Sequence, residues 1–207
     1  MFDWIIRYKK EISWFVIGLC TMNSLFSLSA GTLTLSSLSA DTPYYVFAIY
    51  NPTTKVSTVQ AFSSITPTLP SGYTKKKHIF SFVTNSSGQL RPMEIDGNYV
   101  RYLTSVSSTL SMATSATLTS AIAIPPQSYG DFLIVWGGYA GSAGRSLYLY
   151  NTSDSAKLVL QVGIPSGAGE ASAPVRTKVN SDRKLNYYAS NSTGTITLYT
   201  NGYCLNI

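Results

Sequence analysis

Charged residues are scarce in this sequence. They make up 12% of the 207 residues, about half of the usual share in globular proteins, and Ser, Thr, Gly, Asn and Tyr take their place. A surface of this kind suits sugars or neighbouring subunits better than it suits charge-driven chemistry. The net charge is +6, but apart from Lys9-Lys10 and Lys75 to Lys77 the basic residues are scattered and belong to no recognition motif. We therefore expect no nucleic-acid partner.

Histidine and cysteine are almost absent. The one histidine, His78, has no second histidine or nearby cysteine with which to bind a metal, and a structural role is expected for it. Cys20 and Cys204 lie near opposite ends of the chain, which excludes a disulfide framework or a zinc site. The sequence is compatible with two free thiols and with a single disulfide between Cys20 and Cys204.

Motifs for catalysis and for cofactor binding are also missing. The sequence contains no GxSxG elbow and no GxxxxGK[ST] loop. Glu94 and Asp96 are the one close carboxylate pair, and they would share a face of a strand, but the context "EIDGN" is typical of a turn. We predict no catalytic residue, no metal ligand and no cofactor.

Residues 1–30 differ in composition from the rest of the chain. A basic start, an apolar centre and a small-residue end are typical of a signal peptide, whereas polar residues break the run too early for a membrane span. The third interpretation is a short α-helix used for docking, oligomerisation or anchoring. Apolar residues at steps of three and four form its heptad seam: Ile5, Tyr8, Ile12, Phe15, Leu19, Met22 and Phe26.

From residue 31 onward the pattern is that of β-structure. Short runs rich in β-branched and aromatic residues are separated by turn residues. These runs predict an all-β body, an antiparallel β-sandwich or jelly roll, with hairpins at "YYVFAIYNPTTKVSTVQAF" and at the final Asn201-Gly202. We expect a hairpin and meander module at 31–103 and a sandwich at 104–207, either separate or as one continuous domain, with the Ser/Thr-rich start of 104–121 as a linker.

Tyrosine is the one abundant aromatic residue, with 15 copies. A tyrosine combines a flat apolar face with a hydroxyl group, which suits both sugars and protein interfaces. The candidates for glycan or subunit contacts are those near predicted loops or strand ends: Tyr129, Tyr139, Tyr187, Tyr188 and Tyr203. For Lys75 to Lys77 we favour protection of a strand edge over phosphate binding.

Five pieces between residues 33 and 102 occur in a familiar order. They are "YYVFAIYNP", "PTLPSGYT", "KKK", "TNSSGQL" and "GNYVRY". Together they resemble a module of tail fibres and other minor virion proteins of tailed bacteriophages, in which the corresponding pieces read "WYYVYAIYNP", "PTLPSGYT", a few basic residues, "RTDASGQL" and "GxxVxY". The closing "LNYYASNSTGTITLYTNGYCLNI" is similar to the ends of such proteins.

The resemblance implies a non-enzymatic structural protein of the virion, on a tail, a fibre or the capsid surface. It further implies a homo-oligomer, with a trimer favoured, that contacts other virion proteins and bacterial surface polysaccharide. The alternative is a secreted or membrane-tethered bacterial carbohydrate-binding module, with residues 1–30 as its signal or anchor. A glycan depolymerase that uses Glu94 and Asp96 is a third hypothesis.

Overall fold

The computed structural model describes residues 4–6, 35, 37–111, 116–117, 122–137, 145–150, 158–164, 170–189 and 194–205. Every regular element among them is a β-strand, and the strand pairs whose register is defined are antiparallel. The predicted all-β antiparallel fold is confirmed. None of the described residues forms a helix that could cross a membrane.

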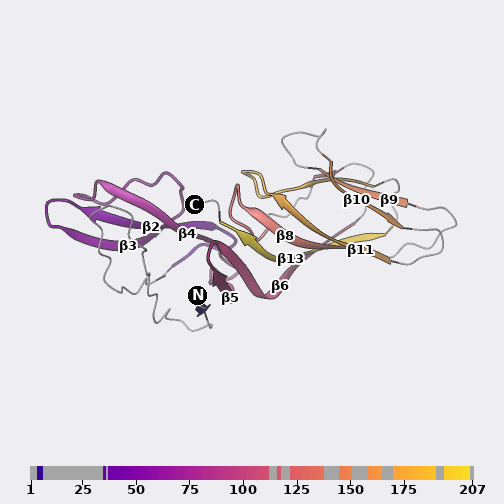
Figure 1. The fold of residues 1–207 in the computed structure, drawn as a ribbon, viewed down its shortest axis with the longest axis horizontal. Coiled ribbons are helices and arrows are strands. Elements are labelled where there is room, and N and C mark those ends of the chain that lie inside the picture. Colours follow the sequence, from indigo (N-terminus) through magenta and orange to yellow (C-terminus); the bar gives the residue numbers. More distant parts are fainter. Residues whose placement is uncertain are drawn as a thin grey trace. The chain divides into compact units, whose positions relative to one another are not determined.

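The chain divides after Arg91 into two compact units. The first unit contains a three-stranded sheet with the order β3-β2-β4 (Figure 1). Its strands are β2 (Pro43–Asn51), β3 (Val56–Phe62) and β4 (Lys75–Val83). The predicted hairpin is the β2–β3 pair.

The core of the first unit lies around its central strand. All residues from Tyr44 to Ile49 are buried, so β2 is covered on both faces. On one face Tyr45, Phe47 and Ile49 form a cluster. Leu69 and Tyr73, from the "PTLPSGYT" piece, pack against this cluster, so that piece serves as a cover for the sheet.

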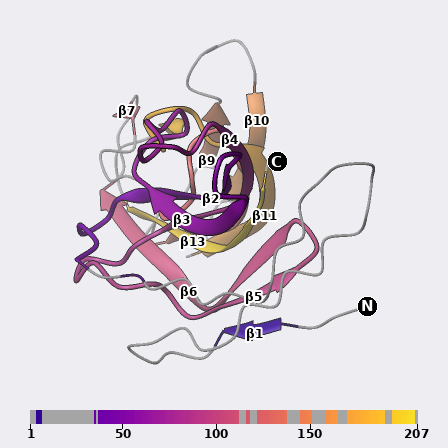
Figure 2. The same cartoon turned by 90° about the vertical axis from the view of Figure 1, so that its left-hand side faces the viewer.

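The second unit contains the chain from Pro92 onward together with Trp4 and Ile5 of β1, and it has two sheets, the layers of the predicted sandwich. The larger has six strands in the order β1-β5-β6-β13-β8-β11, and Figure 2 shows β1 beside β5. Its strands are β1 (Trp4–Ile6), β5 (Met93–Asp96), β6 (Tyr99–Ser111), β8 (Tyr129–Gly137), β11 (Glu170–Lys178) and β13 (Thr195–Cys204). The smaller sheet has the order β10-β9-β12-β7. Its strands are β7 (Ala116–Thr117), β9 (Arg145–Tyr150), β10 (Leu158–Ile164) and β12 (Asn186–Ala189).

Both sheets of the second unit have one buried face. In β8 and β13 alternate residues are buried, among them Ile134, Trp136, Ile196 and Leu198. In β9 the buried residues are Leu147 and Leu149. This is the alternation that "LYLY" and "TITLYT" predict, with one face inward and the other toward solvent.

Several expectations about boundaries need correction. The unit boundary lies at Pro92 and not at 103/104, because β6 continues through residues 103 and 104 and pairs with β13 on both sides of them. The predicted linker therefore begins inside a strand. The predicted meander is also interrupted, because β4 pairs with β2 and meets the next segment only in the single bridge Thr84–Leu90.

Asn201-Gly202 is not a hairpin turn. It lies inside β13, which pairs with β6 on one side and β8 on the other, and both ladders shift register between Thr200 and Gly202. The pair is thus a β-bulge in a central strand. A Cβ at Gly202 would overlap the backbone carbonyl oxygen of Val100 on the neighbouring strand. Glycine is therefore needed there for close packing and not for a turn.

The predicted N-terminal helix falls almost entirely outside the described residues. The exception is Trp4–Ile6, which is strand β1 and includes Ile5 of the proposed seam. A short strand at a sheet edge replaces the helix at these three positions. The other six seam residues lie outside the described part of the chain.

Candidate functional site

Two solvent-facing surfaces of the second unit carry the polar and aromatic side chains. The first, on the six-stranded sheet, is named here the charged row. It runs across five strands in register. Asp131 on β8 is opposite both Arg176 on β11 and Gly202 on β13, and Gly202 is opposite Arg101 on β6. Arg101 is in turn opposite Glu94 on β5. Directly opposed residues share one face of a sheet.

The charges of this row neutralise one another. Arg101 Nε donates to Glu94 Oε2 at 3.1 Å, and Arg176 Nε lies 3.5 Å from Asp131 Oδ1. The Arg101 side chain is 62% exposed, so its ion pair contributes little stability. The carboxylate of Glu94 nevertheless raises the pKa of Arg101 through their hydrogen bond.

Tyr99 and Cys204 lie beside the charged row, opposite each other on β6 and β13. Partial burial, followed by a hydrogen bond to Asp131, raises the pKa of Tyr99 to about 12. Arg176 Nη2 donates to Cys204 Sγ, and Cys204 is a free cysteine, while Cys20 lies outside the described residues. The two ion pairs leave the four charged side chains of the row without net charge.

The second surface, named here the tyrosine row, lies on the four-stranded sheet. Tyr148 on β9 is opposite Gln161 on β10 and Tyr188 on β12. The ring centroids of Tyr148 and Tyr188 are 5.7 Å apart with an interplanar angle of 40°. Gln161 Nε2 donates to Tyr148 Oη at 3.4 Å.

The five tyrosines predicted to contact a glycan or a subunit differ in exposure. Tyr129 and Tyr188 are 49% and 41% exposed, and both can meet a partner. Tyr187 and Tyr203 are buried in the core, and burial raises the pKa of each, so neither is available at the surface. Tyr139 lies outside the described residues.

Sequence reasoning missed Tyr148 and Gln161, and with them the tyrosine row. The alternation in "RSLYLY" and "NYYA" placed these tyrosines on strands but gave no strand partners. The signal that could have narrowed the choice is strand phase, because Leu147 and Leu149 turn inward and leave Tyr148 on the outer face.

His78 has a structural environment in the first unit. Its Nε2 lies 2.9 Å from the carbonyl oxygen of Phe80 and 2.7 Å from Ser81 Oγ, next to the rings of Tyr45 and Phe47. Burial lowers the pKa of His78, against the opposing hydrogen bond to Phe80. Within the described ranges no three His, Cys, Asp or Glu side chains gather as a metal site would require.

The lysines of β4 lie on an edge strand. Lys75, Lys76 and Lys77 are exposed, and among the described strands β4 pairs with β2 alone. Lys76 Nζ lies 5.6 Å from the centroid of the Phe47 ring and donates to the carbonyl oxygen of Pro67 at 3.2 Å. One lysine therefore packs on the first unit while its neighbours extend into solvent.

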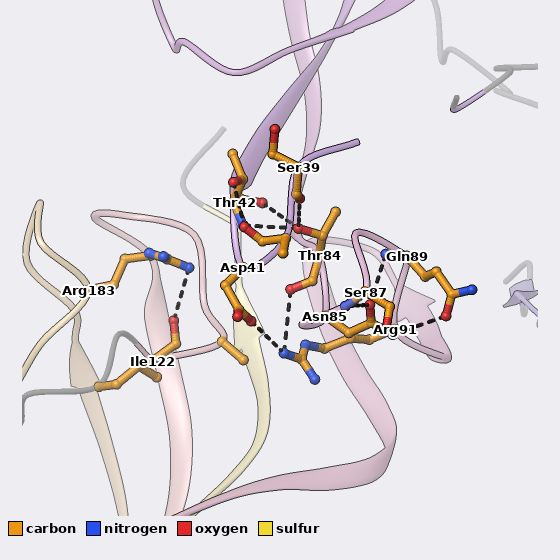
Figure 3. Close-up of polar contacts among 12 residues, drawn as sticks. Ser39, Asp41, Thr42, Thr84, Asn85, Ser87, Gln89, Arg91, Ile122 and Arg183 are labelled. Atoms are coloured by element: carbon orange, nitrogen blue, oxygen red, sulfur yellow. Dashed lines mark hydrogen bonds and ion pairs between the residues drawn. The ribbon is translucent and has the colours of Figure 1, made fainter. Parts of the chain in front are cut away.

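The "TNSSGQL" piece forms a closed turn in the first unit (Figure 3). Asn85 Oδ1 accepts hydrogen bonds from the backbone amides of Ser87 and Gln89, both at 2.9 Å. Thr84 Oγ1 accepts from the Thr42 amide at 2.9 Å and donates to the Ser39 carbonyl at 2.7 Å. The turn thus ties the end of β4 to the segment before β2.

No family model and no curated protein matches the chain. Among solved structures it is similar to the VP2 subviral particle of infectious bursal disease virus and to the structure of that virus's Gx strain. The identities are 12% and 13%, with a TM-score of 0.22 for each. The matches cover 81% and 82% of this chain, which spans about half of those chains, 53% and 52%. A TM-score this low carries no argument about fold or function.

Proposed function

We propose that this protein is a structural virion protein of a tailed bacteriophage, of fibre or receptor-binding type. In this role it attaches the particle to the host surface or joins other proteins of the tail or fibre. Its localisation would be the virion, and a homo-oligomer, with a trimer favoured, is its expected state.

The observation that carries the proposal is the way in which the phage-like pieces fold together. "YYVFAIYNP" forms the buried β2, and "PTLPSGYT" covers one face of it through Leu69 and Tyr73. "TNSSGQL" closes the turn that holds residues 39 to 42. With "KKK", which begins β4, four of the five resembling pieces are therefore parts of a single folded unit. This supports a shared module over a chance match of short strings.

The second unit supports a binding role over an enzymatic one. Glu94, one of the two carboxylates considered for glycan cleavage, is paired with Arg101, and Asp96 follows it on the same face of β5. Two carboxylates that act on one glycosidic bond must flank it from opposite sides. A paired carboxylate and its neighbour on one strand are poorly arranged for that reaction.

The test is labelling of phage particles with a Fab raised against the folded chain. If the protein is a receptor-binding part, the Fab decorates the tail or fibre tips in electron micrographs and blocks adsorption to host cells. Decoration without a block assigns the assembly role instead. Particles that stay undecorated while the Fab binds the free chain would contradict the proposal. Loss of residues 1–30 from a secreted bacterial product would instead favour the carbohydrate-binding module.

A further inference from the structure

The tyrosine row has the chemistry of a small recognition surface. Tyr148 and Tyr188 lie side by side on neighbouring strands, and Gln161 adds an amide on the other side of Tyr148. Tyr188 is 41% exposed and Gln161 is also exposed. β9 is paired with β10 on one side and with β12 on the other, so these side chains are held by a sheet and not by a loop.

We propose that the tyrosine row binds an uncharged saccharide, with a pyranose ring stacked on Tyr188 and its hydroxyl groups held by Gln161 and Tyr148. This inference rests on the proposed receptor-binding function and names the class of receptor that the surface would recognise. Nothing in the charged row is needed for it.

Stacking follows from the shape of the partners. One face of a pyranose carries several C–H groups that point the same way, and a phenol ring offers a flat apolar face of matching size. Tyr188 presents such a ring at the surface of β12. The Tyr148 ring beside it is tilted by 40° relative to the Tyr188 ring, so it can contact the edge of a sugar that is stacked on Tyr188.

Hydrogen bonding supplies orientation. A side-chain amide offers both donors and an acceptor, and a phenol both donates and accepts. Gln161 uses Nε2 on Tyr148 Oη, which turns its Oε1 away as an acceptor for a sugar hydroxyl. The Tyr148 hydroxyl accepts in that bond and keeps its own proton to donate. The pair is therefore oriented before a ligand arrives, which lowers the entropic cost of binding.

The lack of charge sets the ligand class. β9 begins at Arg145, whose side chain lies outside the described part of the structure. The described side chains that share the outer face with the row, Ser146 and Asn186, are polar and uncharged. Among the described strand side chains of this face, an anionic sugar would find no cation to replace its hydration. A neutral hexose or N-acetylhexosamine loses less on leaving water and gains the same stacking.

A second copy of this chain is the competing occupant, because tyrosine is also common in protein interfaces. A stable protein interface buries about 800 Å² on each partner around a well-packed centre. The leucines of β9 that could supply such a centre, Leu147 and Leu149, are turned into the core. A row of two tyrosines and an amide matches the footprint of one or two sugar units better.

The experiment is a glycan array probed with the purified full chain, followed by calorimetric titration. The array carries uncharged hexose and N-acetylhexosamine oligosaccharides beside matched ones that bear uronate or phosphate. Tyr188→Ala should weaken binding of the best uncharged oligosaccharide by about tenfold, the loss expected if stacking contributes on the order of 1.4 kcal/mol. Raised salt should leave the affinity unchanged, because no ion pair is involved.

The matched control is Tyr129→Ala, which removes a similarly exposed tyrosine from the other sheet and should leave binding intact. Tyr188→Phe keeps the ring and should bind as the parent does. Gln161→Ala, at an exposed position, should also weaken binding and serves if Tyr188→Ala lowers the melting temperature.

Binding only to anionic glycans, equal losses in the Tyr129 and Tyr188 variants, or no binding to any uncharged oligosaccharide would overturn the inference. So would a change of oligomeric state in Tyr188→Ala, which would assign the row to a second copy of the chain. Because the array uses the isolated protein, failure here leaves virion membership standing. Conversely, a chain that is absent from particles but binds through Tyr188 would refute the proposed function alone.

Discussion

Gly88 occupies a position in the "TNSSGQL" turn that other residues cannot take without strain. Its φ is +71°, in the left-handed region, and an added Cβ would overlap the carbonyl oxygen of Leu38. Gly97, in the turn between β5 and β6, shares the positive φ, at +59°, but a Cβ there would meet nothing within 4 Å. A comparison of substitutions at the two glycines therefore distinguishes the cost of backbone strain from the cost of steric overlap by an added Cβ.

We expect Gly97→Ala to lower the free energy of unfolding by about 1 kcal/mol, the cost of a left-handed backbone for an L-residue. Gly88→Ala should cost at least about 2 kcal/mol, because a backbone oxygen must also move. Urea denaturation of both variants measures the difference. Equal losses in the two variants would mean that the Leu38 segment yields freely and that the turn does not hold it.

Tyrosines with raised pKa values make stability sensitive to alkali. Burial and Tyr102 raise the pKa of Tyr203 well above 10, and burial with the Asp131 hydrogen bond raises that of Tyr99 to about 12. The unfolded chain loses these protons from about pH 10, whereas the folded chain keeps them. The stabilising contribution is thus fully present below pH 10 and is lost as pH rises toward the folded pKa values.

We expect the free energy of unfolding to fall steadily from pH 10 toward about pH 12. In Tyr203→Phe this pH dependence should be shallower, because one titrating hydroxyl fewer contributes to it. The slope can be compared even if the variant is less stable than the parent at neutral pH. Urea titrations below pH 10 and at about pH 11 measure both slopes. A slope that is the same with and without Tyr203 would show that this hydroxyl does not titrate with unfolding.

Edge strands must be kept from pairing with other chains, and β4 is such a strand in the first unit. Its exposed Lys75 and Lys77 give it charge, whereas Lys76 also packs over Phe47. Charged side chains at a sheet edge discourage edge-to-edge association. This is the structural role that the sequence favoured over a phosphate site.

Replacing Lys75 and Lys77 together by Ser should promote soluble oligomers and lower solubility by roughly twofold or more, while adsorption stays unchanged. Light scattering at rising protein concentration measures it. Replacing Lys55 and Lys184, which lie outside β4, removes the same charge and is the matched control. A selective loss of adsorption in the β4 variant would instead make these lysines a ligand site.

Sequence patterns predict strands well here but not their partners. The β-branched and aromatic residues in runs such as "YYVFAIY" and "TITLYT" predict β-strands. The short turn between two such runs predicts the β2–β3 hairpin. Asn201-Gly202 misled because the same dipeptide suits a two-residue turn or a bulge. The dipeptide forms a bulge because β6 and β8 continue to pair with β13 on both sides of it. This long-range pairing cannot be predicted from the local sequence.

The sequence predicted the type of residue at the candidate surface, tyrosine, but not which tyrosines form it. Tyrosine abundance suggested aromatic contacts, and Tyr188 was among the candidates, yet its neighbour Tyr187 is buried. Two adjacent strand residues face opposite ways, and only the pairing of β12 with β9 decides which one faces outward beside Tyr148. Long-range register therefore creates the tyrosine row.

At the scale of the whole molecule, the two units have different roles in this account. The unit that ends at Arg91 contains most of the stretch that resembles phage virion proteins, and the unit that begins at Pro92 carries the tyrosine row. A module shared among virion proteins, joined to a unit with its own recognition surface, is what a fibre or receptor-binding component requires. Both parts depend on the chain being built into the particle.

The composition of purified phage particles tests that claim most directly. Quantitative mass spectrometry should find this chain in particles banded by density, in a fixed ratio to the portal protein and in multiples of three for each attachment point. A chain that is abundant in infected cells but absent from the banded particles would contradict the account.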